Sequence, residues 1–390
     1  MRILHICGDF FISPVHLSLY KELDALGVEQ IVFSPTDYRD KNRELTYYQF
    51  KCPNSKIIYS RPLRKFHSYL YGLKIHNLVK QIEASVDMST ISLINTSLVC
   101  KEGAVAYKLS QKYGIKYVTS IRNTDLNFYF KYYKWRVTFF EKVMQSASTI
   151  ICISKMYSRR VAETVSKVTA SKIENKLEVI YNGVNQLYIE NRFVHPDYLG
   201  KPIKLVYTGG FQRNKNILNV IEAIKLLRAE RYDIEFFAIG KNLKNHVEPD
   251  YLCKVEKVIQ PLKWVHALDA QPKEKLMLSL REYDIFTMLS HTETFGLSYV
   301  EALSQGLPII YSKGEGFDDI YPDGLVGYHA NSRDVNDIAH SIEKAIKNYL
   351  QLKDNVDKLD MSIFEWPTIA KKYYTIFNQV VNNIQSSCEQ

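Results

Sequence analysis

The stretch Glu293-Thr-Phe-Gly-Leu-Ser-Tyr-Val-Glu301 leads through Ala-Leu-Ser-Gln to Gly306-Leu-Pro308-Ile-Ile, and it has the pattern of a loop, a short helix and a buried strand. Gly306 suits the left-handed residue that ends a helix, and Pro308 prevents the helix from continuing into the apolar residues that follow. A chain that enters a helix through a glycine leaves backbone N–H groups pointing outward, where the helix dipole favours an anion. The stretch therefore predicts an anion-binding site.

Two carboxylates flank the place where that anion would bind. Glu293 lies in the loop before the helix, and Glu301 lies on the helix itself. This arrangement suits a nucleotide sugar, with the diphosphate on the backbone amides and the sugar and ribose hydroxyls on the two carboxylates. The alternative is that both glutamates are solvated and bind nothing.

Outward from this stretch, apolar runs alternate with amphipathic segments along the chain. Strands are expected at 3–7, 30–33, 92–95, 117–121, 149–153, 203–207, 234–239, 285–289 and 309–311. Helices are expected at 17–26, 63–84, 103–113, 217–227, 273–280 and 335–346. The apolar runs lack period-two alternation, which is typical of buried parallel strands. This order predicts an α/β fold of two doubly wound, Rossmann-like domains that face each other across a cleft.

The length of the chain also favours two domains, because 390 residues exceed what one hydrophobic core usually organises. Residues 190–202 are polar and contain turn-forming prolines and a glycine, so they are the expected linker. The N-terminal domain is then expected at 1–189 and the C-terminal domain at 203–365.

The composition is that of a globular protein, with 46% hydrophobic and 24% charged residues, and it excludes a disordered chain. The six cysteines are scattered without a C-x-x-C pair, which favours reduced thiols in the cytosol. No segment approaches the roughly 20 apolar residues needed to span a bilayer. We therefore expect a cytoplasmic protein.

The formal net charge is +9, and no nucleic-acid motif accompanies it. Cations and aromatics are interleaved in the runs 61–74 and 131–136, as they are in helices that lie on a membrane surface. These runs favour peripheral association with the inner face of the cell membrane. The alternative is a solvated face above aromatic side chains in the core.

A second candidate site is the turn Gly209-Gly210-Phe-Gln-Arg213-Asn-Lys215-Asn216, which follows an expected strand and opens a helix. Glycines let the backbone approach a phosphate, and Arg213 and Lys215 supply positive charge. A purely structural turn is the alternative. Both this turn and Glu293 follow the carboxyl ends of expected strands, where ligands bind in doubly wound sheets.

These residues resemble those of glycosyltransferase family 4, whose members are retaining enzymes with the GT-B fold. The similar elements are the E-x7-E stretch from Glu293 to Glu301, the Gly306-Leu-Pro308 after it, Lys215-Asn216, and Asn182-Gly183 at the end of the first domain. Phe364-Glu-Trp366 resembles the start of the family's terminal helix, so residues 366–390 are expected to cross back to the first domain. The resemblance implies acceptor binding by residues 1–189 and nucleotide-sugar binding by residues 203–365.

The resemblance also implies roles for particular residues. The donor diphosphate would contact Gly210, Arg213, Lys215 and the amides of Phe295, Gly296 and Leu297. Glu301 would bind the donor ribose, and Glu293 would position the donor sugar beside its anomeric carbon. Cations and amides would stabilise the charge that develops on the leaving diphosphate. Neither a metal nor a cofactor is therefore expected besides the nucleotide-sugar co-substrate.

The sequence departs from the family pattern at two places. Gly210 stands where many members have an arginine, so the contact with phosphate would fall to Arg213. Arg122 follows the strand after which many members have a histidine, and Asp125 is close to it. Arg122 and Asp125 are therefore candidate catalytic residues, although Asn-Thr-Asp125 is also a plausible helix cap.

The resemblance implies a hexosyltransferase that moves a hexose or N-acetylhexosamine from a nucleoside-diphosphate sugar, most commonly UDP-linked in this family. The acceptor would be a hydroxyl of a glycan or a lipid-linked glycan in the synthesis of bacterial surface polysaccharide. Two alternatives keep the fold: a UDP-sugar 2-epimerase and a noncatalytic GT-B partner protein. A dinucleotide-dependent oxidoreductase is less favoured, because no G-x-G-x-x-G follows the first strand of either half.

Overall fold

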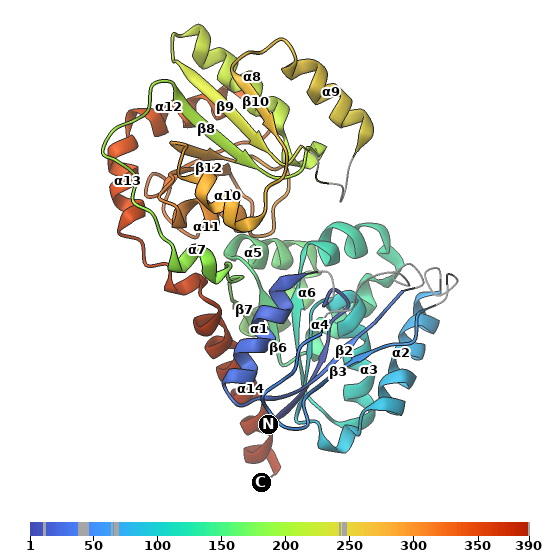
Figure 1. Cartoon of the computed structure of the whole chain (residues 1–390). Helices are drawn as coiled ribbons and strands as arrows, with labels where there is room; N and C mark the ends of the chain where they lie inside the picture. The colour runs from blue at the N-terminus through green and yellow to red at the C-terminus, as the bar shows by residue number, and fades with distance from the viewer. Residues whose placement is uncertain are drawn as a thin grey trace. The chain divides into compact units, whose positions relative to one another are not determined.

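The computed structural model describes residues 1–10, 13–37, 47–63, 65, 70–241, 243 and 248–388, with side chains as far as residue 382. The chain divides into two compact units (Figure 1). The first unit comprises Met1–Ile153, Tyr157–Asn182 and Trp366–Gln390, and the second comprises Ser154–Met156 and Gly183–Glu365.

The first unit holds, within its described residues, a sheet of seven parallel strands in the order β3-β2-β1-β4-β5-β6-β7. The strands are β1 (Arg2–Ile6), β2 (Glu29–Ser34), β3 (Lys56–Tyr59), β4 (Leu93–Thr96), β5 (Tyr117–Ile121), β6 (Thr149–Cys152) and β7 (Leu177–Val179). The helices are α1 (Pro14–Ala25), α2 (Tyr71–Ser85), α3 (Ala104–Tyr113), α4 (Val137–Ser146), α5 (Lys155–Thr164), α6 (Lys167–Ile173) and α14 (Trp366–Cys388).

Both faces of this sheet are buried, which explains why its strands show no alternation of polar and apolar residues. In β1 and the residue after it, Leu4 and Ile6 belong to one hydrophobic cluster, and Ile3 and Cys7 belong to another. All four side chains are fully buried. Successive residues of a strand point to opposite faces, so a strand covered on both sides is apolar throughout.

The C-terminal helix α14 covers one of these faces, and in Figure 1 it lies beside α1. Trp366, Ile369, Tyr373 and Phe377 of α14 belong to the same cluster as Ile3 of β1. The last helix of the chain therefore completes the hydrophobic core of the first unit.

The second unit holds, within the part that the structure describes, six parallel strands in the order β10-β9-β8-β11-β12-β13. The strands are β8 (Ile203–Thr208), β9 (Ile234–Ile239), β10 (Val265–Leu268), β11 (Ile285–Thr287), β12 (Ile309–Ser312) and β13 (Gly327–Ala330). The helices are α7 (Gln186–Glu190), α8 (Ile217–Ala229), α9 (Pro249–Ile259), α10 (Lys273–Leu280), α11 (Leu297–Ser304), α12 (Val335–Lys347) and α13 (Tyr349–Asp357). Two parallel sheets with helices confirm the predicted pair of Rossmann-like domains.

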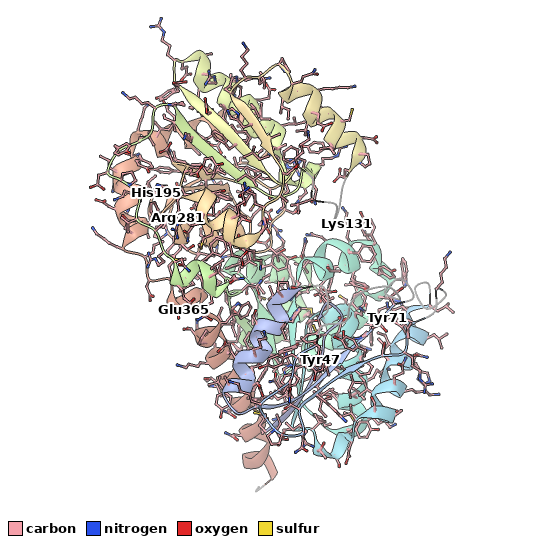
Figure 2. All side chains as sticks on the ribbon, viewed as in Figure 1. Tyr47, Tyr71, Lys131, His195, Arg281 and Glu365 are labelled. Atoms are coloured by element: carbon pink, nitrogen blue, oxygen red, sulfur yellow. The ribbon has the colours of Figure 1, made fainter. Side chains whose placement is uncertain are left out.

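The segment that the sequence favours as a linker, 190–202, packs instead as part of the second unit, which begins at Gly183 rather than at residue 203. Arg281 donates a hydrogen bond to the Asn191 carbonyl at 2.8 Å, and its guanidinium lies over the Phe193 ring. A Cβ on Gly306 would lie 2.9 Å from Cδ2 of His195. Figure 2 shows His195 and Arg281 near each other in this unit. These contacts could not be predicted from a polar, turn-rich sequence, because they join residues 191–195 to Arg281 and Gly306, which are distant in the sequence.

The long helix expected at 63–84 is observed as α2 from Tyr71, and residues 64 and 66–69 lie outside the described residues. Residues 64 and 66–69 are also part of the basic run 61–74, so this part of the run lies outside the described residues. None of the helices in the described ranges has the length and apolar character that crossing a bilayer requires.

Candidate active site

The entry into α11 requires a glycine. Gly296 immediately precedes the helix with φ of +84°, and a Cβ there would lie 2.4 Å from the Tyr299 ring. That ring is fixed in place, because Tyr299 is buried and its hydroxyl donates to the Met288 carbonyl at 2.5 Å. The Phe-Gly pair of the sequence therefore sets the direction in which the first N–H groups of α11 point.

A second loop closes over the residues before α11. The Gly316 N–H donates to the Glu293 carbonyl at 2.8 Å, and the Glu293 N–H donates to a Glu315 carboxylate oxygen at 2.8 Å. A Cβ on Gly316 would lie 2.1 Å from the Thr294 carbonyl carbon. Only a glycine at 316 lets the two backbones approach this closely.

The side chains of Glu293 and Lys215, which the sequence places in separate motifs, meet in the second unit. Lys215 Nζ lies 2.8 Å from Glu293 Oε2, and the two side chains retain 25% and 15% exposure. The other carboxylate oxygen, Oε1, accepts the Thr294 N–H at 3.0 Å. An ammonium has three N–H donors; one is bonded to Glu293, and a second is directed at Met288 Sδ, 3.9 Å away. A positive group with one donor to spare thus lies beside the carboxylate that precedes α11.

Asparagine side chains hold the loops around this pair. Asn214 Oδ1 accepts the Thr292 N–H at 3.0 Å, and Asn214 Nδ2 donates to the Thr292 carbonyl at 2.9 Å. Asn216 has a left-handed backbone, with φ of +57°, and its Nδ2 donates to the Ser332 carbonyl at 2.6 Å. The loops after β8, β11 and β13 are therefore joined at the carboxyl ends of their strands. This is where ligands bind in doubly wound sheets.

The double-glycine turn lies at the same edge of the sheet. Gly209 has φ of +148°, and a Cβ on Gly240 would lie 2.3 Å from the Gly209 carbonyl oxygen. The Gly210 carbonyl accepts a hydrogen bond from the Tyr207 hydroxyl at 2.8 Å. These contacts require small residues in the turn, so the structural alternative is sufficient to explain why glycines occur there.

Arg213 is placed differently from Lys215. Its Nε lies 3.5 Å from Glu248 Oε2, its guanidinium lies 5.3 Å from the Tyr251 ring centroid, and its side chain is 65% exposed. The structure therefore brings Lys215, Glu293, Phe295, Gly296 and Leu297 together, and it engages Arg213 with residues at the start of α9.

Glu301 lies in the middle of α11 and is half-buried. Burial raises the pKa of its carboxyl group, and the opposing charge of Lys273 only partly offsets this. A carboxyl group that is removed from water in this way gains from hydrogen-bond donors, such as hydroxyls, that a ligand would bring.

Arg122 and Asp125 belong to the first unit. Asp125 is fully buried, and its carboxylate accepts backbone N–H groups from Cys100 at 2.8 Å, Arg122 at 3.0 Å and Val99 at 3.3 Å. Burial raises the pKa of Asp125 to about 6, against the lowering effect of these hydrogen bonds. Asp125 therefore joins the backbone at Arg122 to the first residues of the π-helical turn Val99–Gly103, which lies after β4.

Arg122 retains some exposure, while its Nε atom is buried and has no hydrogen-bond partner in the described ranges. The positive charge of Arg122 lies close enough to His16 to lower the pKa of that imidazole, after burial, which is the larger cause. Arg122 follows β5, so it occupies the ligand-binding edge of the first sheet.

Sequence reasoning missed a buried ion pair at this same edge. Lys101 Nζ lies 3.1 Å from Oε1 of Glu102, a fully buried residue on the π-helical turn Val99–Gly103 after β4. A Cβ on Gly8, which follows β1, would lie 2.4 Å from the same oxygen. Strands β1 and β4 are neighbours although they are far apart in sequence, so only the topology reveals this cluster. The one available signal was a charged pair directly after an apolar strand.

The described residues include no group of three or more His, Cys, Asp or Glu side chains arranged to hold a metal ion. Metal independence remains a prediction. Its basis is that Lys215 and the backbone amides of α11 would stabilise the negative charge of a leaving diphosphate.

Two family models match the chain, one in each half. Residues 188–358 match the family described as glycosyl transferases group 1, and residues 15–186 match glycosyltransferase family 4. The two matches together span most of the chain. The chain belongs to glycosyltransferase family 4, and it is a glycosyltransferase with the GT-B fold.

The relatives are distant in sequence. An uncharacterized glycosyltransferase of Methanocaldococcus jannaschii is 26% identical over 313 residues, which are 78% of this chain and 79% of that protein. The lipopolysaccharide 1,2-N-acetylglucosaminetransferase of Salmonella typhimurium is 25% identical over 183 residues, 43% of this chain and 46% of that protein. The solved structure of Anabaena HepE in complex with UDP shares the fold with a TM-score of 0.70 at 16% identity, and the match covers 97% of this chain and 100% of that chain.

Proposed function

We propose that this glycosyltransferase retains anomeric configuration and moves a hexose or N-acetylhexosamine from a UDP-linked donor to a hydroxyl acceptor. The observation that carries this proposal is the Lys215–Glu293 pair, 2.8 Å apart, beside the glycine that opens α11. A diphosphate next to Lys215 would receive N–H donors from the ammonium and from the start of the helix.

The chemistry requires one bond to break and one to form. The bond between the anomeric carbon and the diphosphate oxygen breaks, and its electron pair stays on the diphosphate. The acceptor oxygen bonds to the anomeric carbon on the face from which the diphosphate departs, so that the configuration is retained. The proton of the acceptor hydroxyl passes to the leaving diphosphate oxygen. Lys215 and the amides of Gly296 and Leu297 stabilise the charge that develops on the leaving group. Glu293 orients the donor sugar, and Glu301 binds the ribose hydroxyls.

Two similar proteins support the proposed donor and acceptor classes. The Anabaena structure with the same fold contains UDP, and the Salmonella relative acts on lipopolysaccharide by its name. We accordingly propose a glycan or lipid-linked glycan as acceptor and a role in surface-polysaccharide synthesis. The enzyme would work in the cytoplasm without a metal, associated peripherally with the inner face of the membrane.

The test measures release of nucleoside diphosphate from UDP-, GDP- and ADP-sugars with a broad mixture of glycan and lipid-linked acceptors. We expect release from UDP-sugars, and its loss in Glu293→Gln, because the amide cannot reproduce the charge at the donor sugar. Circular dichroism and thermal unfolding of the variant serve as the folding control. Undiminished turnover in Glu293→Gln would remove that residue from the reaction.

The same experiment separates the epimerase alternative. A UDP-sugar 2-epimerase would interconvert two nucleotide sugars without any acceptor, and NMR of the sugar pool would show this directly. Absence of nucleotide release from every donor, with or without acceptors, would contradict the proposed transferase.

A further inference from the structure

The first unit contains a cavity of about 620 Å³ whose lining residues are separate from those of the candidate active site. Helices α2 and α3 and the start of α4 supply its walls. Figure 2 labels Tyr71, the first residue of α2, which lines it. None of the residues assigned to donor binding or transfer belongs to it.

The floor of this cavity is apolar and aromatic. Tyr71 and Ile75 are buried, and Val79 and Phe139 are half-buried beside them. The Tyr71 ring lies 5.9 Å from the Phe140 ring and 6.4 Å from the Phe139 ring, measured between ring centroids. The guanidinium carbon of Arg136 lies 4.5 Å from the centroid of the Tyr71 ring. A ring held from several sides gives a firm apolar surface.

The rim of the cavity is positively charged. Lys80, Lys108, Lys112 and Arg136 line it, and among the described lining residues Glu83 is the one carboxylate. Lys112 pairs with Glu83 at 2.7 Å. Lys80 and Lys108 are exposed, and no carboxylate of the described residues pairs with either. The rim therefore has two unneutralised lysines above an apolar floor, which suits an amphiphile with an anionic head group.

Exposed apolar side chains continue from the cavity over the neighbouring segment. Phe128, Tyr132 and Trp135 are 45%, 57% and 74% exposed. Leu70 and Leu73, at the start of α2, are 53% and 43% exposed. Large apolar side chains next to lysines are typical of surfaces that lie in the headgroup region of a membrane.

A series of ring contacts connects this exposed surface to the cavity. Trp135 lies 5.4 Å from Tyr133, and Tyr133 lies 5.5 Å from Tyr129, measured between ring centroids. Tyr129 lies 6.0 Å from Phe140, which contacts Tyr71 in the cavity wall. The exposed aromatics therefore pack against the cavity wall through the buried side chain of Phe140.

We propose that this cavity binds the phosphate head group of an anionic phospholipid, with Lys80 and Lys108 on the phosphate and Trp135 and its neighbours inserted at the membrane surface. The apolar floor would contact the glycerol and the first chain methylenes. This site deepens the peripheral association proposed above and rests on that proposed function. Its test is independent of catalysis, because lipid binding is measured without donor or acceptor.

The experiment is flotation of the full chain with vesicles of phosphatidylcholine alone and of phosphatidylcholine with phosphatidylglycerol. We expect binding to the anionic vesicles and at least tenfold weaker binding by Lys80→Glu/Lys108→Glu, given roughly fivefold per basic residue near the surface. The matched control is Lys254→Glu/Lys257→Glu, two exposed lysines on α9 of the second unit. Both doubles change the net charge equally, so a general attraction of a basic protein would weaken both alike.

A second arm tests the aromatic contact. Trp135→Ala is expected to weaken vesicle binding several-fold, while Tyr198→Ala, at a 66% exposed aromatic of the second unit, leaves it unchanged. Glycerol phosphate should not compete at millimolar concentration, because it lacks the chains that contact the floor. No preference for anionic vesicles, equal losses in the two double variants, or full competition by glycerol phosphate would each overturn the lipid site.

Discussion

Burial raises the pKa of Glu301, so the affinity for the donor should depend on pH. A carboxylate accepts ribose hydroxyls best when ionised, and a raised pKa means that Glu301 is protonated at a higher pH than an ordinary glutamate. As the pH is lowered, we therefore expect the affinity for UDP to fall at a higher pH than it would if the ribose were bound by an exposed glutamate. Isothermal titration with UDP across the pH range measures this.

The control for this prediction is Glu301→Gln, which cannot titrate at that position. The phosphate of UDP titrates as well, but equally in both proteins, so the ratio of the two affinities isolates the side chain. The ratio should fall towards one as the pH decreases through the raised pKa. A ratio independent of pH would place the ribose elsewhere.

Individual residues of the site differ in how well the sequence predicted them. Gly296 and Lys215 could be singled out because each belongs to a local pattern, a glycine before a helix and a cation after a glycine turn. Lys101 and Glu102 could not, because their partner Gly8 is distant in the sequence and is brought near by strand pairing. Asp125 could be predicted only in part, since its bond to the Arg122 N–H is local whereas its bond to the Cys100 N–H joins residues that are distant in the sequence.

At the scale of elements, the start of α11 depends on Gly296. A Cβ at this position would meet the Tyr299 ring at 2.4 Å, and φ is +84°. We expect Gly296→Ala to lower the free energy of unfolding by about 1–3 kcal/mol and to weaken UDP binding, because the α11 amides must shift. Urea denaturation and UDP titration measure the two effects.

Gly72→Ala is the matched substitution for this prediction. Gly72 lies in the first turn of α2, and no atom lies within 4 Å of a Cβ built there. Alanine is a better helix former than glycine, so this variant should be as stable as the wild type or slightly more stable. Equal behaviour of the two variants would contradict the strained entry into α11.

The sequence predicted the central strands of both sheets, and it did not predict the strands at their edges. The strands expected at 3–7, 117–121 and 234–239 are found close to those positions, because each is a continuous apolar run. The edge strand β3 was missed, since its residues are only half-buried or exposed and its composition is mixed. The three-residue strand β7 is too short to show a pattern.

At the scale of the whole molecule, α14 connects the end of the chain to the first unit. Phe377 of this helix is fully buried in the cluster that contains Ile3. We expect Phe377→Ala to destabilise the first unit by about 3–5 kcal/mol, because it removes a large buried side chain and leaves a cavity. Thermal and urea unfolding followed by circular dichroism measure this loss.

Lys371→Ala, at an exposed position of the same helix, should change stability by no more than about 0.5 kcal/mol. If Phe377→Ala were equally harmless, α14 would not be part of the core. The resemblance indicated a crossing terminal helix. That Phe377 and Ile3 belong to one hydrophobic cluster required the three-dimensional arrangement, because the two residues lie at opposite ends of the sequence.

We expect a nucleoside diphosphate to bind the second unit at the start of α11. A crystal structure of the protein with UDP tests it most directly. The predicted result places the β-phosphate within hydrogen-bond distance of Lys215 Nζ and the N–H groups of Gly296 and Leu297, with the ribose hydroxyls on Glu301. UDP bound elsewhere, with the Lys215–Glu293 pair remote from its phosphates, would contradict the account.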